Sequence, residues 1–442
     1  MDYIRVLILG ETFRSNGGGG ITLINLFKNW PSDKLAVVTE RIYETSTNSN
    51  CLKFYQLGHL EQKLPFPLSL LMKSINSGEV DIKLNNISHL NSNKKLLQVP
   101  KSYIRKTLNS LLYFLGVYHF IYKTVLSNQL LNWISEYSPD IIYAQPFRYS
   151  DMKFIYELQK RTSIPLAIHF MDDSISFLNK PNLLYYYWRK KTKKIFRQLI
   201  DNSVVLLSIS QFMSDEYYRR YKKIFIPMRN PIDLDQWLPY TKNNWDVSDT
   251  INIVYTGRLA IPNINSLFRF CTVVDNLKKS GINIRFDIYS IDDNLKFRSK
   301  IRYFKGIFLN NPIPYEDVPR LITKYDILLL PIDFNKTGIK YAKYSISTKT
   351  SEYMISGVPI LLFAPEEVAL TSYAVENQCM LSVTEDKYEK LTSALIRLIN
   401  DKSLRESLAK KAFDVVRKDS DANNVRQDLK LLLSSNFKNM NT

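Results

Sequence analysis

Short, nearly continuous apolar runs recur along the chain, each followed by a stretch with helical periodicity. Runs of this length are typical of parallel strands buried on both faces, and their alternation with helices is typical of βαβ units. We therefore expect an α/β protein with parallel strands at 3–10, 34–40, 139–145, 165–171, 203–210, 251–257, 284–290, 325–331 and 358–364.

The pattern pauses at residues 231–250, which are polar, contain two prolines and lack periodicity, and it restarts at Ile251. This pause predicts two Rossmann-like doubly wound lobes, at 1–235 and 250–419, facing a central cleft. In open sheets of this kind a ligand binds at the carboxyl ends of the strands. Residues 60–135 do not follow the pattern, and we expect mostly helices and loops there.

Composition adds limits to this picture. A chain of 442 residues with 45% hydrophobic residues can bury substantial cores, and no apolar run reaches the ~18–20 residues that a spanning helix needs. The three cysteines are far apart and form neither a disulfide framework nor a metal knuckle, which suits a reducing cytoplasm. The net charge of +18 favours nucleic acid, anionic lipid or a phosphorylated substrate, without choosing among them.

Four consecutive glycines, Gly17–Gly20, separate the first expected strand from the helical stretch that follows it. Glycine lets backbone N–H groups approach a ligand closely, and a helix N-terminus favours an anion. Gly18 and Gly19 are therefore candidate ligand contacts. The spacing matches neither GxGxxG nor GxxxxGKS, and the alternative interpretation is a flexible surface loop.

The segment IHFMDDS places His169 and Asp173 at the end of the strand expected at 165–171. At this edge His169 can donate to a substrate hydroxyl, and Asp173 can accept a proton from one. The alternative is an aspartate that caps the next helix beside a histidine whose hydrogen bonds are satisfied in the core. A metal site is not expected, because the chain has only 4 histidines and none pairs at ligand spacing.

Two segments of the second half carry groups suited to a diphosphate. In TGRLAIPN, Gly257 allows a tight turn and Arg258 offers a fork of donors, although a surface ion pair is the commoner role for an arginine. In SISTKTSEYMISGVP, Ser347, Thr348 and Lys349 open a helix and can hold phosphate oxygens. One turn further on, Glu352 can accept from two ribose hydroxyls, or it can face solvent on an ordinary capped helix.

Together, in this order and spacing, these segments resemble a GT-B glycosyltransferase of family 4 (group 1 type). The resemblance covers nearly the whole chain and is most specific at 251–365. The matching pieces are the glycine-rich loop, HFMDD at 169–173, SIS at 208–210, NPID at 230–233, TGRL at 256–259, YDILLLP at 325–331 and TKTSEYMISGVP at 348–359.

The resemblance implies that a sugar passes from a nucleotide-sugar donor to an acceptor with retention, without a metal or other cofactor. It implies a donor held mainly by the C-terminal lobe, an acceptor held by the N-terminal lobe, and a C-terminal helix, within about 420–442, that packs back on the N-terminal lobe. Arg258 matches the diphosphate arginine, Lys349 and Glu352 the lysine and ribose-binding glutamate, and His169 the histidine near the transferred sugar. Gly18 and Gly19 match the loop near the phosphates or acceptor.

Two positions depart from the family pattern. Asn263 stands where a lysine usually follows the arginine, and Tyr344 stands where a second glutamate usually precedes Glu352. The charge of a donor must then be met by other cations, for which the candidates are Lys336, Lys340, Lys343 and Lys349.

A basic, aromatic segment at 180–197 contains seven Lys/Arg, no acidic residue and four consecutive aromatics, and 101–126 is similar in character. Such segments can lie on anionic lipid, with the aromatics at the headgroups and the lysines on phosphates. The alternative is a solvated helix face with its aromatics in the core.

Other functions remain open at this stage: a two-lobed epimerase or hydrolase acting on a nucleotide sugar, and a basic nucleic-acid binder. The first needs a set of carboxylates that the sequence does not display, and the second lacks a zinc spacing or an RNP-like strand. We expect the transferase, acting in bacterial surface polysaccharide assembly in the cytoplasm, with peripheral membrane contact.

Overall fold

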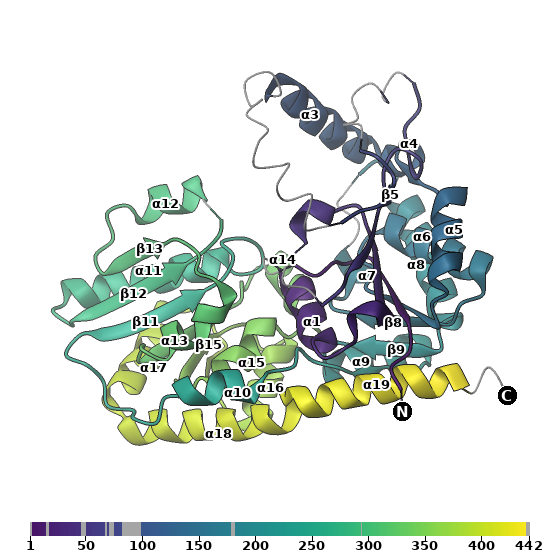
Figure 1. Ribbon diagram of the computed structural model, residues 1–442. Coiled ribbons are helices and arrows are strands. Elements are labelled where there is room, and N and C mark those ends of the chain that lie inside the picture. Colours follow the sequence, from purple (N-terminus) through teal and green to yellow (C-terminus); the bar gives the residue numbers. More distant parts are fainter. Residues whose placement is uncertain are drawn as a thin grey trace. The chain divides into compact units, whose positions relative to one another are not determined.

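The computed structural model describes residues 2–14, 17–45, 50–66, 69, 75–81, 99–177, 182–292 and 294–438. The chain divides into two compact units (Figure 1). Unit 1 comprises residues 1–228 and 426–442, and unit 2 comprises residues 229–425. Residues 180–181 of the basic segment and 439–442 of the C-terminal segment lie outside the described residues.

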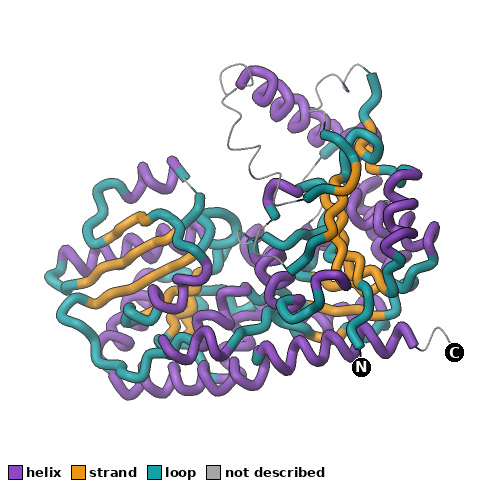
Figure 2. Tube along the Cα trace, in the orientation of Figure 1, coloured by secondary structure: helices purple, strands orange, loops and turns teal. Residues whose placement is uncertain are grey.

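Unit 1 contains a sheet with the strand order β10-β9-β8-β7-β1-β2-β3-β5. Figure 2 draws the strands in orange. All neighbours pair in parallel except β3 and β5, which are antiparallel. The strands are β1 (Val6–Leu9), β2 (Leu35–Thr39), β3 (Lys53–Gln56), β5 (Gly78–Glu79), β7 (Ile141–Ala144), β8 (Leu166–Phe170), β9 (Val205–Ser208) and β10 (Ile226–Pro227); β4 (Gln62–Lys63) and β6 (Lys123–Thr124) form a separate pair.

Helices connect these strands, and polar residues mark several of their starts. The side chain of Ser127 caps one helix and that of Ser210 caps another, each by accepting a backbone N–H three residues on. The helices are α1 (Gly18–Phe27), α3 (Val99–Leu115), α4 (Tyr118–Ile121), α5 (Asn128–Tyr137), α6 (Tyr149–Thr162), α7 (Ser174–Phe177), α8 (Tyr185–Asp201) and α9 (Gln211–Tyr221), with most of α19 (Ala422–Lys438).

Unit 2 contains an all-parallel sheet with the order β13-β12-β11-β14-β15-β16. Its strands are β11 (Ile251–Thr256), β12 (Ile284–Tyr289), β13 (Ile307–Asn310), β14 (Ile327–Pro331), β15 (Ile360–Phe363) and β16 (Leu381–Val383). Its helices are α10 (Leu234–Trp237), α11 (Ile264–Lys279), α12 (Leu295–Ile301), α13 (Val318–Ile322), α14 (Lys336–Ala342), α15 (Thr348–Ile355), α16 (Ala369–Asn377), α17 (Tyr388–Asn400) and α18 (Lys402–Ser420).

Every strand expected from an apolar run is present, and the α/β class is confirmed. β1 shows why: all four of its residues are buried, and parallel neighbours flank it on both sides. The strands that the pattern missed are short or lie at sheet edges, as β10, β13 and β16 do. None of the described helices is long and apolar enough to cross a membrane.

Candidate functional site

The end of β11 and the helix α15 are joined by direct hydrogen bonds in unit 2. The backbone N–H of Thr256 donates to the Tyr353 hydroxyl over 2.8 Å. Tyr353 is fully buried and directly follows Glu352, so this bond holds α15 against the carboxyl end of the strand. The two motifs, TGRL and TKTSEY, therefore lie together although about 90 residues separate them.

The Tyr255 hydroxyl is the centre of this junction. It accepts from Lys349 Nζ over 3.2 Å and from Asn263 Nδ2 over 2.8 Å, and it donates to the Arg258 carbonyl over 2.9 Å. Lys349 Nζ also lies 4.4 Å from the centroid of the Tyr255 ring, a cation–π contact. The Tyr255 hydroxyl thus brings together Lys349, the Arg258 backbone and Asn263. Asn263 is the residue at the usual lysine position.

Gly257 allows Lys349 to reach this position. A Cβ at residue 257 would lie 2.0 Å from Lys349 Nζ and 2.8 Å from the Tyr255 hydroxyl. The backbone φ of Gly257 is also +150°, a conformation that other residues rarely adopt. The glycine expected for a tight turn is therefore also required by the close approach of the ammonium group.

Lys349 and Glu352 carry perturbed pKa values on one short helix. Burial lowers the pKa of Lys349 to about 8, and the nearby Glu352 carboxylate opposes that shift. Burial raises the pKa of Glu352 to about 7, opposed by a Tyr315 hydrogen bond and by Lys349. Glu352 is only 6% exposed, so a solvent-facing Glu352 is excluded. Both charged forms are poorly hydrated, as binding residues often are.

The first turn of α15 has polar groups that do not cap it. Ser347 stands at the N-cap position, and its side chain makes no capping hydrogen bond. The Thr350 hydroxyl is buried without a hydrogen-bond partner among the described residues. Thr348 and Lys349 follow Ser347 at the helix start, where backbone N–H groups point outward and favour an anion.

The Arg258 guanidinium forms a surface ion pair. Its Nε and Nη2 atoms donate to Asp292 over 3.2 and 3.1 Å, and Asp292 also accepts from the Leu259 N–H. The Arg258 side chain is 66% exposed. The surface ion pair, the alternative for this arginine, is the conformation present.

The remaining cation candidates of unit 2 are exposed and lie on or beside α14; they are Lys336, Lys340 and Lys343. Lys343 Nζ lies 5.5 Å from the centroid of the Tyr344 ring, so the residue at the usual glutamate position contacts a cation through its ring.

In unit 1 three of the four glycines belong to a helix, which does not fit the alternative of a flexible surface loop. α1 already begins at Gly18, and Gly18–Gly20 form its first turn. Close contacts favour glycine at two of these positions, because a Cβ at Gly20 would lie 2.5 Å from the Arg14 carbonyl oxygen and one at Gly19 would lie 2.9 Å from Glu11 Oε2. Gly18 is exposed at the helix start.

His169 is fully buried with both ring nitrogens engaged. Nδ1 lies 2.7 Å from the Tyr143 hydroxyl, and Nε2 lies 3.1 Å from the Met228 carbonyl. A carbonyl only accepts, so Nε2 carries the proton and Nδ1 accepts from Tyr143. Burial lowers the pKa of His169 to about 4, which keeps the ring neutral. This is the geometry of a histidine satisfied within the core.

Asp173 is likewise buried among donors of unit 1. Its carboxylate accepts from the Tyr217 hydroxyl over 3.0 Å, from Arg220 Nη1 over 3.1 Å and from the Ser176 hydroxyl. It directly precedes α7, and its carbonyl accepts the Ser176 N–H, as in the capping alternative. No motif in the sequence predicted the ion pair between Asp173 and Arg220 on α9.

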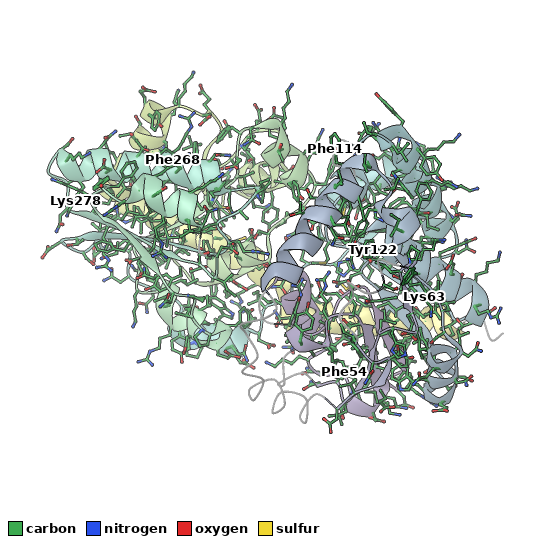
Figure 3. All side chains as sticks on the ribbon, turned by 90° about the horizontal axis from the view of Figure 1, so that it is seen from above. Phe54, Lys63, Phe114, Tyr122, Phe268 and Lys278 are labelled. Atoms are coloured by element: carbon green, nitrogen blue, oxygen red, sulfur yellow. The ribbon has the colours of Figure 1, made fainter. Side chains whose placement is uncertain are left out.

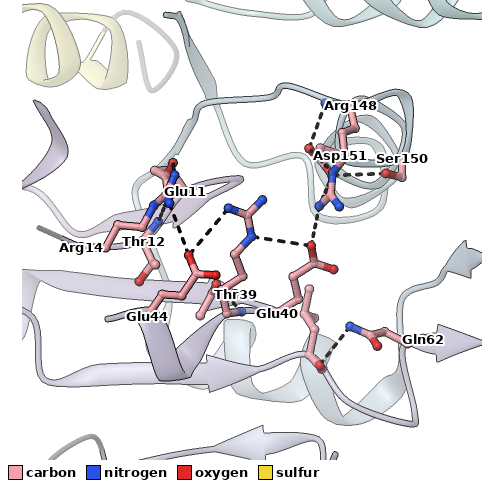
Figure 4. Close-up of polar contacts among 12 residues, drawn as sticks. Glu11, Thr12, Arg14, Thr39, Glu40, Glu44, Gln62, Arg148, Ser150 and Asp151 are labelled. Carbon is pink, nitrogen blue, oxygen red and sulfur yellow. Dashed lines mark hydrogen bonds and ion pairs between the residues drawn. The ribbon is translucent and has the colours of Figure 1, made fainter. Parts of the chain in front are cut away.

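Sequence reasoning missed a charged cluster at the carboxyl ends of β1 and β2. It joins acidic and basic side chains from the loops after these strands and from the start of α6, as Figure 4 shows. A charge directly after each apolar run, as in LGETF and VVTER, is the signal that could have indicated it. Among the described residues no group of three or more His, Cys, Asp or Glu is placed to hold a metal ion.

One family of known proteins matches part of the chain. Residues 250–401, which include the Tyr255 junction, match the family described as Glycosyl transferases group 1. No curated protein sequence matches the chain.

Solved structures resemble the chain over nearly its whole length. The sucrose-phosphate synthase of Thermosynechococcus elongatus has a TM-score of 0.63 at 11% identity and covers 98% of this chain and 99% of its own. Anabaena HepE in complex with UDP and glucose has a TM-score of 0.60 at 12% identity, covering 98% and 100%. A glycosyltransferase from Rickettsia africae has a TM-score of 0.58 at 11% identity, covering 99% and 100%.

These likenesses define the fold as GT-B, with two Rossmann-like domains. The family match over residues 250–401 supports a glycosyltransferase. Its C-terminal unit is of the group 1 type, which confirms that part of the sequence-based resemblance.

Proposed function

We propose that unit 2 binds a nucleotide-sugar donor at the junction of β11 and α15, and that the protein transfers the sugar to an acceptor. The observation that carries this proposal is that Lys349 and Glu352 lie on the same turn of α15, with Lys349 beside Gly257. Both groups are desolvated, and their pKa values are about 8 and about 7. A ligand that supplies an anion and hydroxyl donors stabilises both charged forms.

In this proposal the diphosphate lies against the first turn of α15. Lys349 Nζ and the N–H groups after Ser347 meet its oxygens, and Glu352 accepts from the ribose hydroxyls. Cleavage of the sugar–phosphate bond leaves additional negative charge on the diphosphate. Preorganised cations and N–H dipoles stabilise this developing charge, and one such contact contributes about 3 kcal/mol to the transition state.

Arg258 joins this set when its guanidinium exchanges Asp292 for a phosphate oxygen. The exchange has a small cost, because an exposed ion pair contributes about 0–1 kcal/mol. We further propose that transfer proceeds with retention and without a metal, as the family resemblance implies. The neighbour HepE has been solved with UDP-glucose, which makes a uridine diphosphate sugar the first donor to test.

Donor titration tests the proposal. Calorimetry with UDP-, GDP-, dTDP- and CMP-sugars is expected to identify a ligand of the wild-type protein, and Lys349→Met is expected to weaken its binding about a hundredfold. Lys387→Met is the matched control, because Lys387 is an exposed lysine of unit 2 paired with Glu385. Equal donor affinity in Lys349→Met and wild type would remove the proposed site.

Product analysis separates transfer from related chemistry. Proton NMR of the product reports the configuration at the anomeric carbon, so retention is observed directly. Turnover that continues unchanged in excess chelator supports metal independence. A donor that is epimerised or hydrolysed at the full rate without any acceptor would instead indicate an epimerase or hydrolase.

We also propose that unit 1 contacts anionic membrane from the cytoplasmic side, in bacterial surface polysaccharide assembly. The segments around α3–α4 and the start of α8 meet where the Leu183 N–H donates to the Phe114 carbonyl over 3.0 Å. Phe114, labelled in Figure 3, lies at the end of α3. Large apolar side chains are exposed around this contact: Leu111, Tyr113, Phe114, Leu115, Phe120, Leu183, Tyr186 and Tyr187.

Exposed cations adjoin these apolar side chains on α8, including Lys190, Lys191 and Lys194. Apolar groups at headgroup depth beside lysines are typical of peripheral binding to anionic lipid. Flotation with phosphatidylglycerol vesicles at low salt is expected to carry the wild-type protein upward, whereas neutral vesicles are not. Replacing the three lysines by glutamate is expected to abolish flotation.

The matched control reverses three exposed lysines of unit 2 instead, at Lys296, Lys300 and Lys387. If both triple variants lose flotation equally, net charge alone explains binding and the apolar surface of α3, α4 and α8 has no special role.

A further inference from the structure

The position of the Tyr255 side chain is fixed by the core of unit 2. Tyr255 lies near the end of β11, which pairs with β12 and β14 on its two sides, and its register partner on β12 is Ile288. The side chain is fully buried in the apolar cluster that also contains Phe270 and Ile288. Close packing on this scale holds a ring in one place. The phenol therefore has its position before any ligand binds.

The three hydrogen bonds of the Tyr255 hydroxyl determine which way its proton points. The Arg258 carbonyl, 2.9 Å away, can only accept, so the phenol proton is directed to it. Both lone pairs of the oxygen then face donors, which are Asn263 Nδ2 at 2.8 Å and Lys349 Nζ at 3.2 Å. Toward Lys349 the phenol is therefore an acceptor.

The phenol keeps its proton. Burial raises the pKa of Tyr255 well above its ordinary value, and the nearby Tyr353, Asp292 and Asp333 add to the shift. The contact with Lys349 thus joins an ammonium to a neutral hydroxyl. A phenolate would neutralise the charge of Lys349 within the protein, whereas a neutral acceptor leaves that charge for an anionic ligand.

Lys349 has donors left over after this contact. An ammonium carries three N–H groups, and among the residues that the structure describes the Tyr255 hydroxyl is the single hydrogen-bond partner of Lys349 Nζ. Glu352 acts on Lys349 as a nearby charge. Two N–H groups therefore remain for a ligand.

The Tyr255 side chain holds this ammonium through two of its parts. The hydroxyl lies 3.2 Å from Lys349 Nζ, and the ring centroid lies 4.4 Å from it. A lysine has a long, flexible stem, and ordering that stem opposes binding unless the protein has ordered it in advance. A fixed phenol beside the ammonium provides that order.

We propose that Tyr255 is a positioning residue of the donor site, which holds the Lys349 ammonium in place before the donor arrives and while its remaining N–H groups meet the diphosphate. This role rests on the proposed function. Because Tyr255 acts through Lys349, it strengthens donor binding only when Lys349 is present.

A double-mutant cycle tests this dependence. Tyr255→Phe keeps the ring and removes the hydroxyl, and it is expected to weaken donor binding about tenfold in calorimetry, as the loss of one hydrogen bond to a charged group does. In a Lys349→Met background the same substitution is expected to have no further effect, because the two residues act as a unit. An equal loss in both backgrounds would overturn the proposal, since Tyr255 would then act on the fold of unit 2 and not on Lys349.

Tyr373→Phe is the matched control. It removes another buried tyrosine hydroxyl of unit 2, on α16, where it donates to Asp419 over 3.2 Å. The melting temperature is expected to fall in both tyrosine variants, whereas donor affinity is expected to fall only in Tyr255→Phe. A tenfold weaker donor affinity in Tyr373→Phe as well would show that lost stability explains the effect.

The pKa of Lys349 in the donor-free protein gives a readout that general destabilisation does not move. NMR of lysines labelled at Cε reports it, with the resonance assigned by its absence in Lys349→Met. The pKa is about 8 in the wild type. It is expected to be lower in Tyr255→Phe, because a hydrogen bond that favours the charged ammonium is lost, and unchanged in Tyr373→Phe. An unchanged pKa in Tyr255→Phe would contradict the proposed contact.

A measurement on the wild-type protein needs no variant and applies even if Tyr255→Phe does not fold. Nuclear Overhauser effects between the Cε protons of Lys349 and the ring protons of Tyr255 would be recorded without donor and at saturation with UDP-glucose, or with the nucleotide sugar that calorimetry identifies. We expect the contact in both states. Its disappearance on saturation would show that Lys349 leaves the phenol to bind the donor, and the proposal would fail.

Failure of the proposed function can be told apart from failure of this inference. If no nucleotide sugar binds although the pKa of Lys349 falls in Tyr255→Phe, the donor site is wrong and the anchoring of Lys349 stands. If a nucleotide sugar binds and its affinity depends on Lys349, but Tyr255→Phe changes neither that affinity nor the pKa, the donor site stands and Tyr255 has no positioning role.

Discussion

The ends of β8 and β11 offer an instructive comparison. Both are carboxyl ends of buried parallel strands, and both are followed by polar motifs that suggested chemistry. At the end of β8, His169 has both ring nitrogens bonded and Asp173 accepts from three side chains. Beside the end of β11, on α15, Lys349 has one hydroxyl partner at 3.2 Å, and Glu352 is buried with its pKa raised to about 7.

The difference teaches that residue type and strand end do not by themselves make a binding site. A polar group can serve a ligand when its hydrogen-bonding or charge capacity is incompletely met within the protein. At β8 that capacity is consumed by Tyr143, Met228, Tyr217 and Arg220, whereas at β11 a close-approach glycine holds an ammonium beside a phenol. Four experiments can break or sharpen this contrast.

The largest effect is expected from Asp173→Ala, as a loss of stability. The substitution leaves the buried Tyr217 hydroxyl without its acceptor and removes one of the two carboxylates paired with Arg220, the other being Glu216. Losing these charge-assisted hydrogen bonds costs about 3 kcal/mol or more. Denaturant unfolding measures the loss, and Asp215→Ala, an exposed aspartate of α9, is the control. Donor affinity is expected to be unchanged. Unchanged stability with a large fall in kcat would instead make Asp173 the proton acceptor, the open alternative of the sequence.

Gly257→Ala is expected to act on the donor site. The new Cβ would lie 2.0 Å from Lys349 Nζ, so the ammonium must move, and kcat/KM for the donor should fall about a hundredfold. Gly281→Ala is the matched control: Gly281 has a φ of +94° with nothing within 4 Å, so it carries the backbone strain without the contact. If the two variants lose activity equally, strain and not Lys349 explains the effect.

The pH dependence of donor affinity should form a bell with its maximum between the two pKa values. Glu352, with a pKa of about 7, must be ionised to accept ribose hydroxyls, so affinity rises as pH rises through 7. Lys349, with a pKa of about 8, must be protonated, so affinity falls as pH rises beyond 8. Each limb approaches about a tenfold change per pH unit. A nucleotide sugar is the suitable probe, because its diphosphate is a diester that does not titrate in this range.

Single variants assign the two limbs. Lys349→Met is expected to remove the alkaline limb and Glu352→Gln the acidic one, measured by calorimetry across the same pH series. A donor affinity that does not change with pH in the wild-type protein would contradict the proposed contacts. The polar groups beside β11 would then be structural, as those at β8 are.

Much of this fold could be predicted from the sequence, because strands such as β1 and β11 are buried on both faces and leave a continuous apolar signal. The order TGRL and TKTSEY likewise indicated the positions of Gly257 and Lys349. The central residue of that site, Tyr255, was not predictable. In the sequence it is one more residue of an apolar strand, and the three hydrogen bonds of its hydroxyl depend on tertiary packing. The satisfied state of His169 depends on Met228, 59 residues away, for the same reason.

The smallest effect is expected from Asp292→Asn, which bears on the exposed Arg258. The asparagine oxygen can still accept the Leu259 N–H, but the carboxylate that competes with a diphosphate for Arg258 is gone. Donor affinity should rise about two- to fivefold at low ionic strength, and the gain should shrink in high salt because exposed charges are screened. Asp386→Asn, which breaks the Arg269 surface pair, is the control of equal charge change. A gain that persists when Arg258 is also replaced by alanine would show that it comes from net charge, and Arg258 would then join His169 and Asp173 as a structural group.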